Sequence, residues 1–385
     1  MNLFQYPFSL LILVATTFLT GCHHDRSSES NQAAKNKLSS YQLQTDYAKS
    51  FRVIYHEKYK EVIVNNAWKG SDRTFRYLLA PPEVELPDDD AEVIRVPVEN
   101  IVCFSTTHIP LLDYLGVTDK LVGFPNTDFI SSEKARLLID QGEVADLGTT
   151  EDVNLEILLD LDPDLVMTFA MENDDDRFDM IKRAGIPVVF NADYMENTPL
   201  GRAEWIKFMS LFFNLEQKAD SIFGKIEYAY DTLQQLVANA GQEPSVLSGI
   251  VYGDTWFMPG GENYAAKFFE DANSSYLWSD NDEISYLELS FESVYDQAAD
   301  TEFWVGVGTY NSREELLEAD SRYRDFKAFQ ENRVYNYNAR MGATGGNEYF
   351  ELGYLRPDLV LADLISIFHP ELLPEYEMYF HKKLE

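Results

Sequence analysis

The chain has 385 residues, enough for two lobes of ordinary domain size, and 45% of them are hydrophobic, which provides material for a core in each lobe. Its 31 Lys and Arg residues are outnumbered by 65 Asp and Glu residues, so the net charge is −34. A field of this sign repels nucleic acid and anionic lipid surfaces, so we expect no nucleic-acid partner, and an anionic ligand needs a local basic patch.

The N-terminal region contains an apolar run over residues 8–19, which leads into Leu19-Thr20-Gly21-Cys22. This ending resembles a bacterial lipobox, which implies that residues 1–22 are a lipoprotein signal peptide and that Cys22 is lipidated. A transmembrane anchor is the alternative, but the run is shorter than the about 20 apolar residues that a spanning helix needs. We therefore expect a lipid-anchored, periplasmic protein of the cell envelope, with a flexible polar tether over residues 23–46.

Residues 47–95 predict a small β-rich extension that packs on the first lobe. Val62-Ile63-Val64 and Phe75-Arg76-Tyr77-Leu78-Leu79 have the β-branched and aromatic composition of strands, and Lys69-Gly70-Ser71-Asp72 supplies a turn between them.

Residues 96–213 predict an N-terminal α/β lobe. Strand patterns alternate with helix patterns and lie at residues 101–104, 121–124, 163–167 and 187–190. Strands that are separated by helices and short loops favour a parallel sheet. The last helix expected in this lobe spans residues 199–213.

A long helix is predicted over residues 214–240. Apolar residues recur along it at every third or fourth position, at Leu215, Ala219, Ile222, Ile226, Ala229, Leu233 and Leu236. No proline interrupts the pattern, and Asn214 is a candidate N-cap. A helix of about 25 residues spans roughly 37 Å, which suits a connector between two lobes, although a long amphipathic helix within one domain has the same pattern.

Residues 241–385 predict a second α/β lobe. Strands are expected at residues 245–252, 302–307 and 334–337, and helices at residues 264–271, 321–329 and from Arg356 onward. Asn263 is placed to cap the first of these helices. The segment Asp254 to Gly261, which ends in Pro259-Gly260-Gly261, is expected to be a loop.

The two halves repeat one unit. Asn154-Leu155-Glu156 leads a helix in the first lobe, and Asp164 follows eight residues after the glutamate. Ser290-Phe291-Glu292 leads a helix in the second lobe, and Asp300 follows at the same interval. An acid in the first helical turn is favourable by about 0.3–1 kcal/mol in any helix, so either glutamate alone has a structural explanation, and the matched pair weakens that explanation.

From about residue 95 to the end, the chain resembles the iron-siderophore and cobalamin class (class III) of ABC-transporter substrate-binding proteins. The resemblance lies in the order and spacing of its motifs: residues 154–166, the loop from Trp256 to Gly261, residues 290–300, and Arg356-Pro357-Asp358-Leu359-Val360 with His369-Pro370. It implies two parallel-sheet α/β lobes joined by a single long backbone helix, with the ligand held in the cleft; the small N-terminal β-rich extension precedes the part of the chain that the resemblance covers. It also implies that Glu156 and Glu292 dock onto the transmembrane subunits of an ABC importer.

Candidate ligand-binding residues follow the predicted strands, where loops face the crevice of an α/β sheet. They are Thr106, Thr107, His108, Tyr194, Trp256, Phe257, Gly260, Gly261 and Arg340. The aromatic residues suit a large, partly apolar ligand, and Arg340 can pair with a carboxylate or with the negative charge of a chelate. Each has a structural alternative: Trp256 can belong to the core, Arg340 can be a surface residue, and His108 can cap a helix.

The function expected on this basis is the capture of a small-molecule metal chelate, an iron siderophore or haem, by a tethered and monomeric binding protein. Cobalamin is the alternative ligand. A free metal-ion site is less favoured because only six His residues exist and three of them, His23, His24 and His381, lie near the ends. A carboxylate-based hydrolase is unsupported by any motif, so we expect no enzyme activity, no resident cofactor and no metal site.

Overall fold

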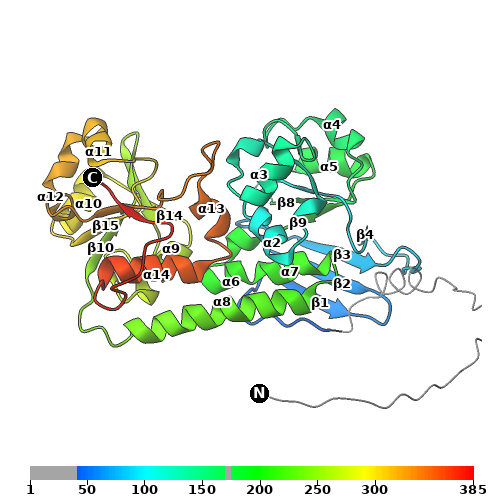
Figure 1. Ribbon diagram of the computed structural model, residues 1–385, viewed down its shortest axis with the longest axis horizontal. Coiled ribbons are helices and arrows are strands. Elements are labelled where there is room, and N and C mark those ends of the chain that lie inside the picture. Colours follow the sequence, from blue (N-terminus) through cyan, green and yellow to red (C-terminus); the bar gives the residue numbers. More distant parts are fainter. Residues whose placement is uncertain (1–40, 170–174) are drawn as a thin grey trace, which may run out of the picture. The chain divides into compact units, whose positions relative to one another are not determined.

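The computed structural model describes residues 41–169 and 175–385, and it consists of two α/β lobes with a β-sheet extension (Figure 1). The sequence-based fold class is confirmed. The signal peptide, Cys22 and residues 23–40 of the tether lie outside the described residues.

The N-terminal lobe is built on a five-stranded parallel sheet with the strand order β7-β6-β5-β8-β9. Its strands are β5 (Ile101–Cys103), β6 (Leu121–Phe124), β7 (Ala145–Asp146), β8 (Leu165–Thr168) and β9 (Val188–Phe190). Its helices are α2 (His108–Leu115), η1 (Thr118–Lys120), η2 (Thr127–Phe129), α3 (Glu133–Asp140), α4 (Leu155–Asp160), α5 (Asp175–Arg183) and η3 (Asp193–Met195). The single helix expected over residues 199–213 is instead two, α6 (Pro199–Ala203) and α7 (Trp205–Leu211).

The C-terminal lobe also has a five-stranded sheet, with the order β13-β10-β15-β16-β17, in which β17 alone is antiparallel. Its strands are β10 (Ser245–Ser248), β13 (Ser275–Tyr276), β15 (Phe303–Val305), β16 (Val334–Asn336) and β17 (Lys382–Lys383). Its helices are α9 (Tyr264–Asp271), α10 (Phe291–Ala298), α11 (Arg313–Ala319), η4 (Ser321–Asp325), α12 (Lys327–Gln330), α13 (Glu348–Leu352) and α14 (Pro357–Phe368). Asn263 caps α9 as predicted, because its side chain accepts a hydrogen bond from the Ala265 amide.

A second, antiparallel sheet in this lobe corrects two sequence-based expectations. It contains β11 (Ile250–Tyr252), β12 (Thr255–Pro259) and β14 (Tyr286–Leu289). The expected strand over residues 245–252 breaks at Gly249, which has φ +83° and lies so close to Phe257 that a Cβ atom there would be 2.0 Å from its carbonyl oxygen. The expected loop from Asp254 to Gly261 is largely strand β12, since Trp256 and Met258 both turn into the core.

The long helix α8 (Glu216–Val237) contacts α7 in the first lobe and α14 in the second, and it runs beneath both lobes in Figure 1. Its buried apolar stripe includes the predicted Ala219 and Ile226 but runs through Phe223 and Tyr230 rather than Ile222 and Ala229. Asn214 does not cap α8. It adopts a left-handed conformation (φ 54°), and its side-chain oxygen accepts a hydrogen bond from Lys60 instead.

The β-rich extension is a four-stranded sheet with the order β1-β2-β3-β4. Its strands are β1 (Phe51–Tyr55), β2 (Lys60–Asn65), β3 (Thr74–Ala80) and β4 (Glu92–Arg95). The first three are antiparallel, and β4 pairs parallel to β3. Phe51 packs on Trp205 and Phe208 of α7, so the extension shares a core with the N-terminal lobe.

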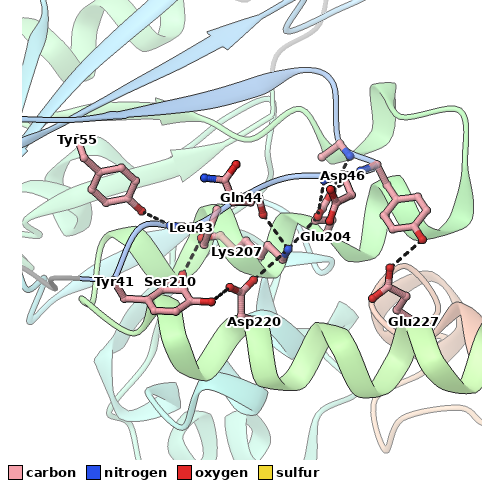
Figure 2. Close-up of polar contacts among 12 residues, drawn as sticks. Tyr41, Leu43, Gln44, Asp46, Tyr55, Glu204, Lys207, Ser210, Asp220 and Glu227 are labelled. Carbon is pink, nitrogen blue, oxygen red and sulfur yellow. Dashed lines mark hydrogen bonds and ion pairs between the residues drawn. The ribbon is translucent and has the colours of Figure 1, made fainter.

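The segment of residues 41–50 is held against α7 and α8, although a flexible tether is predicted as far as residue 46 (Figure 2). The carboxylate of Glu204 is fully buried and accepts hydrogen bonds from the amides of Asp46 (3.0 Å), Tyr47 (2.8 Å) and Ala48 (2.7 Å). The Lys207 ammonium lies 3.0 Å from the same carboxylate. The Leu43 amide donates to the Tyr55 hydroxyl (3.0 Å), and Lys207 donates to the Gln44 carbonyl (2.8 Å), so residues 41–46 belong to the folded body.

Candidate functional site

The two lobes contact each other through the segment that follows β16. The carboxylate of Glu351 in α13 accepts hydrogen bonds from the amides of Ser131 (2.5 Å) and Ser132 (2.9 Å) in the first lobe. The Thr344 hydroxyl donates to the Asp128 carbonyl (2.6 Å). Gly346 packs so tightly on Phe129 that a Cβ atom would lie 2.3 Å from its carbonyl oxygen. This segment therefore bridges the lobes.

A first cavity beside this bridge lies in the C-terminal lobe, at the ends of β10, β15 and β16. It has a volume of about 180 Å³ and is mostly apolar and aromatic. Its lining includes Phe257, Phe268, Tyr264, Tyr286, Tyr337 and Tyr349. This is the edge at which α/β sheets commonly hold their ligands.

The second cavity, of about 200 Å³, lies between the lobes. The first lobe contributes Tyr194, Met195, Asn197 and Arg202, the extension contributes Lys69, and the second lobe contributes Asn263, Tyr264, Ile284, Ser285, Tyr286 and Tyr354. Asn263, Tyr264 and Tyr286 line both cavities, which are therefore adjacent parts of one cleft.

Arg202 is the central cation of the second cavity. Its guanidinium carbon lies 3.5 Å from the centroid of the Tyr264 ring and 4.4 Å from that of Tyr354, which are cation–π distances. Its Nε and one terminal nitrogen donate to the carbonyls of Glu196 and Tyr194. The other terminal nitrogen, Nη1, is buried and has no hydrogen-bond partner among the described residues.

The cleft carries positive charge, from Lys69 and Arg202, although the whole chain is strongly negative. Among the described residues that line either cavity, none is Asp or Glu, although the chain has 65 of them. Asp193 lies close behind the second cavity, and burial raises its pKa to about 6 although Thr107 and Arg202 oppose the shift. Burial also raises the pKa of Tyr337 and Tyr354, so these phenols remain neutral hydrogen-bond donors at pH 7.

The structure places the predicted ligand-binding residues unevenly. Tyr194 and Phe257 line the cleft. Gly260 and Gly261 instead allow close packing against the loop of residues 279–285: a Cβ atom at Gly260 would lie 2.1 Å from the Glu283 carbonyl oxygen. Arg340 lines a separate groove, where its Nε donates to Glu348 (2.6 Å).

Trp256 and His108 are core residues, which corrects their expected place in the cleft. The Trp256 side chain is fully buried among Phe291, Trp304 and other rings, and its indole nitrogen donates to the Ser248 carbonyl. His108 is also fully buried, and burial lowers its pKa to about 3. Both side chains therefore lie in the core, where they pack against apolar neighbours, and not in the cleft.

Thr106 and Thr107 are partly buried near the start of α2 and line neither cavity among the described residues. The Thr107 hydroxyl lies 2.9 Å from Ser105 Oγ, and it also bonds the Asp193 carboxylate. Thr107 therefore does not face the cleft; it orients the buried Asp193 carboxylate behind it.

Glu156 and Glu292 lie exposed in the first turns of α4 and α10, one on each lobe. Asn154 and Ser290, which stand at the head of the two repeated units in the sequence, cap these helices. The Glu292 carboxylate is 3.2 Å from Arg322, which is itself bonded to Asp320, whereas Glu156 has no ion pair among the described residues. Both carboxylates are accessible to a partner.

The cleft residues that the sequence patterns did not reveal include Lys69, Arg202, Tyr264, Tyr286 and Tyr354. Arg202 had one usable signal, because it is the only charged residue of α6, whose other residues are Pro, Leu, Gly and Ala. Tyr264 directly follows the helix cap Asn263. The others carry no local signal.

No helix among the described residues is long and apolar enough to cross a membrane. Nor does the described part of the chain contain three or more His, Cys, Asp or Glu side chains grouped so that they could hold a metal ion.

Two parallel-sheet lobes, a shared backbone helix and a cleft at the strand ends define a two-lobed solute-binding fold. A family model described as periplasmic binding protein matches residues 101–341, and the chain belongs to this family. Two uncharacterised lipoproteins of Methanocaldococcus jannaschii are 24% and 25% identical to the chain, over 97% and 94% of it and 95% of each relative.

Solved structures share the fold. The periplasmic heme-binding protein RhuT of Roseiflexus sp. RS-1 matches with a TM-score of 0.55 at 17% identity, over 71% of this chain and 99% of that one. CeuE of Helicobacter pylori, solved as a nickel–histidine complex, matches with a TM-score of 0.56 at 16% identity, over 82% and 91% of the two chains. The family match confirms the predicted resemblance to periplasmic binding proteins, and these structures confirm the two-lobed fold.

Proposed function

We propose that this protein captures an iron chelate, a siderophore or haem, in the cleft between its lobes and delivers it to the permease of an ABC importer. The observation that carries the proposal is the lining of the cleft, which is rich in tyrosine and free of acidic residues among those described. Aromatic rings and phenol donors suit a large ligand with an apolar body and polar oxygen atoms. Structural neighbours named heme-binding, from Roseiflexus and Pseudomonas aeruginosa, agree with this ligand class.

Tethering by a lipid at Cys22 is part of the same proposal. The lipobox-like sequence and the lipoprotein names of the two Methanocaldococcus relatives support it. A lipid anchor keeps the binding protein near the importer, which raises its effective concentration there.

The ligand class is tested by titrating the detergent-solubilised chain with haem, a ferric tris-catecholate, a ferric tris-hydroxamate and cyanocobalamin. The proposal expects micromolar or tighter binding of at least one iron chelate, with one site per chain. Binding of cyanocobalamin alone would favour the alternative within the same class. Absence of binding to all four would refute capture of a chelate.

The fluorescence readout follows from the placement of the tryptophans. Trp205, Trp256 and Trp304 are fully buried in the core, whereas Trp68 is only partly buried and neighbours Lys69 of the cleft. We therefore expect Trp68 to respond directly to an occupied cleft, and a Trp68→Phe variant to lose part of the emission change that ligand binding produces.

The docking role of Glu156 and Glu292 is tested by the double variant E156A/E292A. We expect unchanged chelate affinity and loss of uptake. The reason is that the permease recognises the relative position of the two lobes through charge-assisted contacts with one glutamate on each lobe. Asp160 and Asp296 provide a matched control, since they lie exposed four residues further along the same helices. Uptake by E156A/E292A equal to that by D160A/D296A would contradict the role.

A further inference from the structure

The loop of residues 66–73, which joins β2 to β3, forms part of the wall of the second cavity. The Ala67 carbonyl accepts a hydrogen bond from the Tyr194 hydroxyl (3.1 Å). The Arg73 guanidinium lies over the rings of Trp68 (5.6 Å) and Phe75 (5.2 Å). The hydrogen bond from Tyr194 ties the loop to the first lobe, and the Arg73 contacts order the loop within the extension. The match to the periplasmic binding protein family begins at residue 101, so this wall is an addition to the family domain.

Lys69 in this loop reaches across to the second lobe. Its ammonium lies 3.2 Å from Glu283 Oε1, and both side chains are well exposed, at 65% and 37%. Glu283 belongs to the loop that packs on Gly260 and Gly261, which therefore fix its position relative to Lys69. Exposed pairs of this kind are weak and exchange partners readily.

Arg202 supplies the second positive charge of the same cavity. It is 8% exposed, and its Nη1 has no hydrogen-bond partner among the described residues. A buried guanidinium nitrogen without a partner is unfavourable unless a ligand or water completes it. An oxyanion is a favourable partner for a charged donor, and Nη1 is the nitrogen left to bind it, because Nε and the other terminal nitrogen already donate to backbone carbonyls.

We propose that Lys69 and Arg202 form an oxyanion subsite of the cleft, and that Glu283 is a counter-ion which the ligand displaces from Lys69. The inference rests on the proposed function and specifies its ligand: a chelate with an exposed anionic oxygen group, such as a carboxylate or a catecholate. The absence of acidic residues from the described lining removes the repulsion that a chain of net charge −34 otherwise exerts. The neutral phenols of Tyr286 and Tyr354 add donors without adding negative charge.

The test compares anionic and non-anionic chelates across three variants of the full chain. Lys69→Met keeps a long, unbranched side chain and removes the charge. We expect it to weaken haem and ferric tris-catecholate binding about five-fold at low salt, the range of a partly exposed ion pair, and to leave a ferric tris-hydroxamate without negative charge unaffected. Glu283→Gln removes the competing carboxylate, so it should strengthen binding of the same anions by a few-fold. The double variant should bind as Lys69→Met does.

Lys58→Met is the matched control, because Lys58 is exposed in the turn between β1 and β2 of the same sheet and lines neither cavity. Equal affinity of Lys69→Met and Lys58→Met for the anionic chelates would overturn the proposal. Equal weakening of charged and uncharged chelates by Lys69→Met would also overturn it, because the loop would then contribute to the shape of the cavity but not to the recognition of charge. If the wild-type chain binds none of the chelates, the proposed function fails and the subsite fails with it.

Discussion

The buried ion pair between Lys60 and Glu216 offers the sharpest test of how the extension is joined to the backbone helix. Lys60 begins β2 and Glu216 begins α8, and the side chains are 1% and 0% exposed. The Lys60 ammonium donates to the Leu211 carbonyl (2.8 Å), the Asn214 side chain (2.9 Å) and the Glu216 carboxylate (2.7 Å). Burial lowers the pKa of Lys60, while Glu216 opposes the shift.

Replacing Lys60 by Met leaves the Glu216 carboxylate buried without its cation. Loss of one partner of a buried pair costs about 3–5 kcal/mol of unfolding free energy. The double variant Lys60→Met/Glu216→Leu removes both charges, and such replacements are often close to neutral. We expect it to lie within about 2 kcal/mol of wild type, because two neutral acceptors still lose their donor.

Urea unfolding followed by circular dichroism measures these differences, with Lys58→Met as the exposed control. We expect that control to change stability by less than about 0.5 kcal/mol. The reasoning is refuted if Lys60→Met costs less than about 1 kcal/mol, or if the double variant is less stable than Lys60→Met.

Two further predictions concern buried carboxylates. Glu204→Gln should cost about 2–4 kcal/mol and expose residues 43–48 to limited proteolysis, because an amide cannot accept from three backbone amides and a lysine; proteolysis equal to that of wild type would contradict this. Burial raises the pKa of Glu351 to about 7, so its protonated form favours the folded state. Its stabilisation is complete below the unfolded pKa near 4.5 and is lost as the pH rises through 7. Asp193 titrates in the same window, so Glu351→Gln should reduce the fall in unfolding free energy between pH 4.5 and 8 by about 2–3 kcal/mol without abolishing it; an unchanged slope would disprove the assignment.

Much of the architecture could be predicted from the sequence, because its signals lie within short segments. The caps Asn154, Asn263 and Ser290 were readable because an N-cap side chain bonds amides two or three residues away, within one segment of sequence. The long helix was readable for the same reason, although the register of its buried stripe depended on α7 and α14.

The cleft depended on contacts between distant segments. Lys69, Arg202 and Tyr264 come from the extension, the first lobe and the second lobe, and no spacing in the sequence brings them together. The prediction that Trp256 lies in the cleft was wrong because Pro259-Gly260-Gly261 indicates a loop. Pairing with β14 instead makes the preceding residues a buried strand. Residues 41–46 look like a polar tether because their partner, the Glu204 carboxylate, is more than 150 residues away.

The most direct measurement of the central claim is the dissociation constant of the iron chelates for wild type, Tyr264→Ala and Tyr228→Ala. Tyr264 lines both cavities and lies against Arg202, whereas Tyr228 is 75% exposed on α8. The account predicts micromolar or tighter binding to wild type, a loss of at least about ten-fold in Tyr264→Ala, as for a buried aromatic anchor, and no change in Tyr228→Ala. Binding by folded Tyr264→Ala as tight as by wild type, or no binding by wild type, would contradict it.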